Sequence, residues 1–118
     1  MAVTLYTTNY VPGCKVDKVI GLVYGMTVRS RGLGGNIIAG LRTLGGGEIH
    51  EYTELAHQAR QQALDRLSHQ AETLGANAVI SVLFDSTEIG TTMDEIIAFG
   101  TAVVISPLPE GQQYVKLS

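Results

Sequence analysis

The chain has 118 residues, with 8 lysines and arginines against 11 aspartates and glutamates, and its formal net charge is −3. The basic residues are scattered and form no stripe, which argues against a nucleic-acid partner. The single cysteine, Cys14, has no internal disulfide partner, and the first residues lack the layout of a signal peptide. We therefore predict a cytoplasmic protein that forms one domain over residues 1–118, with a core at about 18–106 and short extensions at 1–17 and 107–118.

The first part of the chain predicts a short edge strand and then a long strand. Asn9, Pro12 and Gly13 indicate a turn within residues 1–17. A strand then runs from Lys18 to about Arg29. Gly21 and Gly25 lie on one face of it, where missing side chains allow a bulge or the close approach of a helix.

Two helices are predicted next, separated by glycines. A short helix is expected over Ile37–Leu44, and Gly45–Gly47 ends it. A long helix is expected over Glu48–Leu74, with Gly75 just past its end. Its apolar residues form one stripe at three- and four-residue spacing: Tyr52, Leu55, Ala56, Ala59, Ala63, Leu67 and Leu74. The opposite, solvated side contains Glu54, Gln58, Gln61, Asp65, Ser68 and Glu72.

The last part predicts two antiparallel strands, Asn77–Asp85 and Glu95–Ser106, joined by a hairpin region over Glu88–Asp94. The fold class is therefore α+β. We expect a small β-α-β-β unit with three main strands, one short helix and one long helix.

Three stretches are apolar enough for strands that are buried on both faces: Val19–Val28, Ala76–Phe84 and Ile96–Ile105. The last is about half as long as the ~20 residues that a membrane-spanning helix needs, so we predict no membrane partner. A helix about 10 Å wide covers roughly two strands, which lie about 4.8 Å apart. The helices can therefore cover only one face of the sheet. The other face is left for a second copy, and we predict a homo-oligomer.

His50, Glu54 and His57 are the strongest candidates for metal ligands. Their spacing of four and three residues places them on one helical face, and imidazole with carboxylate suits a divalent transition metal. An ordinary solvated helix face explains the same pattern. Cys14 could add a thiolate or act as a nucleophile, but no base or electropositive pocket is evident beside it, and a small, partly buried thiol is the interpretation that we prefer.

A glycine- and arginine-rich segment forms a second candidate site. Backbone N–H groups before a helix, together with arginines, can hold an anion such as phosphate. The segment matches neither a P-loop nor a dinucleotide fingerprint. Tight packing at a subunit contact, with the arginines paired to Glu48, Glu51 or Asp85, is the alternative. The residues concerned are Arg29, Arg31, Gly34, Gly35, Arg42, Gly46, Gly47, Glu48, Tyr52 and Arg60.

The chain also resembles the YbjQ family of small bacterial and archaeal proteins between about Val19 and Ile105. The resemblance is carried, in order, by Gly25–Arg31, Ala39–Arg42, Gly46–Glu48, Tyr52–Thr53, Ala59–Arg60, Leu74–Val79 and Gly100–Val103. It implies a dodecin-like β/α unit that assembles into pentamers, and a heavy-metal-binding label without an established activity. His50, Glu54 and His57 lie between these motifs, so the resemblance gives them no ligand role.

Two functional hypotheses follow. The first is a non-enzymatic homo-oligomer, a pentameric ring by the resemblance, that binds a metal or a small ligand at its subunit contacts. The second is a protein or enzyme that binds an anionic or phosphate ligand through the motif over residues 29–48.

Overall fold

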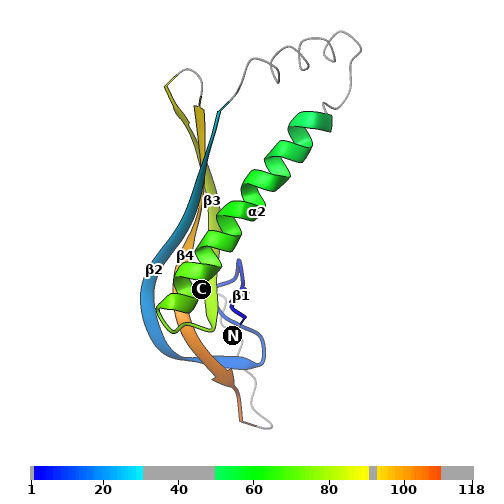
Figure 1. The fold of residues 1–118 in the computed structure, drawn as a ribbon. Coiled ribbons are helices and arrows are strands. Elements are labelled where there is room, and N and C mark those ends of the chain that lie inside the picture. Colours follow the sequence, from blue (N-terminus) through cyan, green and yellow to red (C-terminus); the bar gives the residue numbers. More distant parts are fainter. Residues whose placement is uncertain (1, 31–49, 91–92, 110–118) are drawn as a thin grey trace.

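The computed structural model describes residues 2–30, 50–90 and 93–109. Its elements are β1 (Thr4–Leu5), β2 (Cys14–Ser30), α2 (His50–Thr73), β3 (Ala78–Ile89) and β4 (Met93–Pro107) (Figure 1). The predicted short helix Ile37–Leu44 and the glycines Gly45–Gly47 lie outside the described residues. No helix in the described part of the chain is both long and apolar enough to cross a membrane.

The four strands form one mixed sheet in the order β1-β3-β4-β2. β1 runs parallel to β3, whereas β4 is antiparallel to both β3 and β2. This confirms the α+β class, the antiparallel pair β3–β4 and the short edge strand near the start of the chain.

The long strands extend beyond their predicted limits. β2 begins at Cys14, where the sequence predicted Lys18, because Cys14, Lys15 and Val16 pair with the end of β4. β3 and β4 continue to the pair Ile89↔Met93, inside the predicted hairpin region. Pairing with a neighbouring strand outweighs the weak strand propensity of the polar residues there.

α2 covers one face of the sheet and forms the core with it. Along β2, Val23 and Gly25 face the helix, and Gly25 lies against the helix backbone at Ala63 and Leu67. Register shifts between Val19 and Gly21 mark a bulge. Both roles predicted for Gly21 and Gly25 are thus confirmed. The core cluster contains Val23, Ala63, Leu67, Ala71, Ala76, Val79, Val82, Ala98 and Ala102.

The predicted apolar stripe of the long helix is only partly buried. Ala59, Ala63 and Leu67 are buried, but Leu55 and Leu74 are 48% and 51% exposed, and Ala56 is exposed as well. Figure 1 shows the reason at the N-terminal end: α2 crosses the sheet obliquely and diverges from it there. Periodicity marks one side of a helix, but the crossing angle decides how much of that side touches the sheet.

Candidate functional site

Three side chains of α2 reach the outer edge of β2. Gln62, Arg66 and Gln70 are spaced four residues apart and so lie on one side of the helix. The Gln70 Oε1 accepts a hydrogen bond from the Tyr24 backbone N–H at 2.7 Å, and the Arg66 Nη1 donates to the Met26 carbonyl at 2.6 Å. β2 is an edge strand. Gln70 and Arg66 therefore satisfy backbone groups that an edge strand leaves unpaired.

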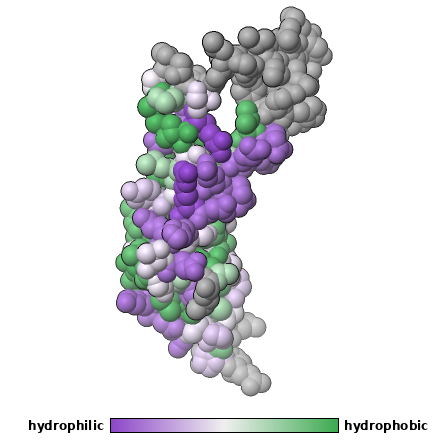
Figure 2. Space-filling view, in the orientation of Figure 1, coloured by the Kyte–Doolittle hydropathy of each residue, from purple (hydrophilic) through white to green (hydrophobic). Residues whose placement is uncertain are grey.

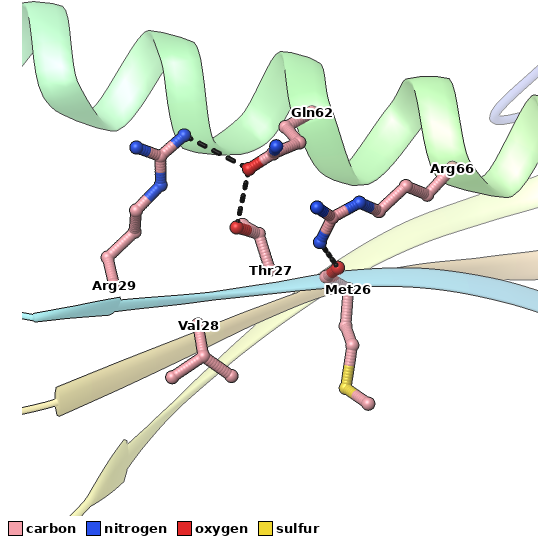
Figure 3. Close-up of a pocket in the computed structure, with 6 residues that line it drawn as sticks. All are labelled: Met26, Thr27, Val28, Arg29, Gln62 and Arg66. Atoms are coloured by element: carbon pink, nitrogen blue, oxygen red, sulfur yellow. Dashed lines mark hydrogen bonds between the residues drawn. The ribbon is translucent and has the colours of Figure 1, made fainter.

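A cleft of about 580 Å³ lies beside these contacts, between β2 and α2. Figure 3 shows Thr27 and Arg29 pointing from β2 toward the helix, whereas Met26 and Val28 point away from it. The lining residues are Met26, Thr27, Val28, Arg29, Gln62 and Arg66.

Gln62 joins the two walls of the cleft. Its Oε1 accepts hydrogen bonds from the Thr27 Oγ1 at 2.7 Å and from the Arg29 Nη2 at 3.0 Å. The Arg29 Nε is buried and has no hydrogen-bond partner among the described residues. The lining carries two guanidinium groups and no carboxylate. Such a lining attracts anions and repels cations.

Of the predicted anion-binding residues, the structure places Arg29 in the cleft and Arg60 outside its lining. The Arg60 guanidinium lies over the Phe84 ring, 5.8 Å from its centroid. The side chain of Tyr52 lies outside the described part of the chain, and the same holds for the whole of Arg31, Gly34, Gly35, Arg42, Gly46, Gly47 and Glu48. Sequence reasoning missed Gln62, Arg66 and Gln70. Their spacing of four beside the alanine stripe was the available signal.

The predicted metal ligands are described only in part. Glu54 and His57 are exposed on α2, and the Gln58 Nε2 donates to the Glu54 Oε1 at 3.4 Å. His50 begins α2, but its side chain is not described. Within residues 2–30, 53–90 and 93–109, no three His, Cys, Asp or Glu side chains are placed to hold a metal ion together. Cys14 is a half-buried free thiol at the start of β2.

The face of the sheet opposite α2 exposes large apolar side chains over part of its length, and we call it the open face. By strand register it also carries Asp85, Thr87 and Glu95, and Ala78 and Val103 at its other end are buried. Strand pairing aligns Tyr24, Phe99 and Leu83 in one row across three strands. Leu22 is 71% exposed and Leu83 is 58% exposed. The large apolar residues of this face are Leu22, Tyr24, Met26, Val28, Ile80, Leu83, Ile97 and Phe99. In Figure 2 hydrophilic residues cover the outer side of α2, and hydrophobic residues come to the surface along the sheet beside it.

Comparisons with known proteins agree with the predicted resemblance. A model of the YbjQ family, described as "Putative heavy-metal-binding", matches residues 3–106. A "UPF0145 protein" of Methanocella arvoryzae is 56% identical over 98% of this chain and 96% of its own length. Another, from Saccharolobus solfataricus, is 65% identical over 80% of this chain and 82% of its own length.

One solved structure has a similar fold. A Pediococcus pentosaceus protein of unknown function, of the DUF74 family, matches with a TM-score of 0.62 at 12% identity. The match covers 88% of this chain and 98% of that one. At this identity the likeness shows the fold alone. The family model and the relatives show more, and the chain belongs to the YbjQ family of UPF0145 proteins.

Proposed function

We propose that this protein is a non-enzymatic homo-oligomer whose copies associate through the open face and bind a small ligand at or beside that contact. The apolar row Tyr24–Phe99–Leu83 carries the proposal, because contiguous exposed apolar patches mark interaction surfaces. The occupant is a second copy, since the same chain supplies an apolar face of the same kind. A pentameric ring in the cytoplasm is the arrangement that we propose, in line with the family resemblance and with the lone cysteine.

The binding cleft and the open face share one strand, which supports a ligand site close to the subunit contact. Alternation along β2 directs Thr27 and Arg29 into the cleft, and Met26 and Val28 toward the open face (Figure 3). Assembly over the open face would therefore hold β2, and with it one wall of the cleft, in a fixed position.

Replacing Leu22 with glutamate should dissociate the assembly and leave the subunit folded. A charge buried between copies without a partner is costly, whereas in the separate subunit this position is exposed to water. Light scattering on the wild type should give a multiple of the 12.6 kDa subunit mass, and Leu22→Glu should give a smaller mass. Leu74→Glu is the matched control, because Leu74 is 51% exposed but lies just beyond α2. A wild-type monomer at micromolar concentration would refute the proposed assembly.

A divalent transition metal is the ligand that the family description favours, and His50, Glu54 and His57 are the residues that we propose for it. One copy supplies at most three ligands, so water or a neighbouring copy would complete a tetrahedral site. Calorimetry with zinc, nickel and copper should then show about tenfold weaker binding for His57→Ala. His69→Ala is the control, because His69 is exposed on the same helix near its other end. Equal affinities for wild type and His57→Ala would exclude the triad.

The second candidate is the anion-binding protein or enzyme that would use residues 29–48. Arg29 is described within a carboxylate-free cleft, and this observation favours an anionic ligand.

A further inference from the structure

We propose that the cleft between β2 and α2 binds a small oxyanion of the phosphate or carboxylate type, with Arg29 and Arg66 supplying the positive charge. The proposal deepens the ligand-binding function proposed above and rests on it only in assuming that the protein holds a ligand. The oxyanion is a ligand distinct from the metal proposed above, and it is assigned to residues outside the His50, Glu54 and His57 set.

The first argument is the excess of hydrogen-bond donors in the cleft. A guanidinium carries five N–H donors, accepts no hydrogen bond and stays protonated. Arg29 donates through Nη2 to Gln62, and Arg66 donates through Nη1 to the Met26 carbonyl. The Arg29 Nε is buried without a partner among the described residues. A buried polar atom of this kind is rare in native proteins and calls for an explanation.

The second argument is the orientation of Gln62. Arginine can only donate, so the atom that accepts from Arg29 must be the amide oxygen, and the Thr27 hydroxyl donates to the same atom. The Gln62 Nε2 is therefore a further donor at the cleft. Two guanidinium groups, an amide N–H₂ and no lining carboxylate give a site that suits an oxyanion and repels a metal cation.

The structural role of the same residues does not use up these donors. Arg66 and Gln70 satisfy the edge of β2, and Gln62 ties Thr27 and Arg29 to α2. Asp94 lies opposite Arg29 in the β2–β4 register, but it does not line the cleft. An oxyanion would take the donors that these contacts leave over, and binding would break none of the hydrogen bonds described.

Calorimetry and thermal shift with phosphate, sulfate and acetate, against chloride at matched ionic strength, test the proposal. Phosphate or acetate should raise the melting temperature of the wild type more than chloride does. Arg66→Gln and Arg29→Gln should each weaken that binding about tenfold or more. Arg60→Gln, which removes the same charge from α2 outside the cleft, should bind like the wild type. The better of the phosphate and acetate arms identifies the class of oxyanion.

A wild-type measurement covers the case in which the cleft variants fail to fold. In a ¹⁵N-labelled sample the Arg29 Nε–H resonance should shift on addition of phosphate or acetate, and that of Arg60 should not. The proposal would be overturned if phosphate and acetate changed the melting temperature and the Arg29 Nε–H resonance no more than chloride does. It would also be overturned if Arg60→Gln and Arg66→Gln lost the same amount of affinity for the oxyanion. Light scattering on the same samples separates the two proposals. An assembled protein without an oxyanion response overturns only the ligand class, and a monomer that binds the anion supports the ligand class while refuting assembly.

Discussion

Replacing Gly25 with alanine should lower the free energy of unfolding by about 3 kcal/mol or more, because the new methyl group would overlap the backbone of α2. A Cβ built at Gly25 meets the Ala63 carbonyl oxygen and the Leu67 backbone nitrogen, and it lies 2.8 Å from the Arg66 carbonyl carbon. Backbone atoms of a helix cannot move aside as the end of a flexible side chain can. The helix as a whole would have to lift from the sheet, and the packing of Leu67 and Ala63 would be lost. Urea denaturation followed by circular dichroism measures the change.

Gly13→Ala separates this steric effect from backbone strain. Gly13 has φ +77°, a conformation that alanine adopts at a cost of roughly 1–2 kcal/mol, but nothing lies within 4 Å of an added Cβ. We therefore expect Gly13→Ala to be the milder variant. If Gly25→Ala proves as stable as Gly13→Ala, the result would contradict the close packing of the α2 backbone against Gly25.

Replacing Val23 with glutamate should unfold the subunit. Val23 is 0% exposed and packs in the core beneath α2, among Leu67, Ala63 and Ala98. A carboxylate there would be buried without a partner, and such a charge costs about 4 kcal/mol or more, a large part of the 5–15 kcal/mol that stabilises a typical domain. The far-ultraviolet circular dichroism spectrum at 25 °C, together with a urea melt, would detect the loss.

Leu22→Glu is the matched control for this experiment. Leu22 is the preceding residue of β2, points to the open face and is 71% exposed in the single subunit. Its glutamate variant should keep the native spectrum even though it loses assembly. Equal loss of structure in both variants would show that the two faces of β2 are not as different as the structure describes.

The sequence alone determined the order and class of the elements. Continuous apolar stretches indicated the strands, and three- and four-residue periodicity indicated the helix. Gly75, which has φ +88° in the structure, marked its end. These signals are local, because strand propensity, helical periodicity and left-handed glycines each depend on a few neighbouring residues. The excess of apolar surface also predicted the open face, because the predicted helices are wide enough to cover only one face of the sheet.

Which residue faces which way was decided only by the tertiary structure. Leu22 and Val23 are both apolar, and only the register of β2 against β4 and the position of α2 make one of them core and the other surface. Leu55 belongs to the apolar stripe in sequence but is 48% exposed. It lies near the N-terminal end of α2, and this end of the helix diverges from the sheet. The cleft could not be predicted from the sequence either. Arg29 and Gln62 are 33 residues apart, and no local pattern indicates that they share a hydrogen bond. Local chemistry fixes what an element is, whereas contacts between distant elements fix which of its side chains meet.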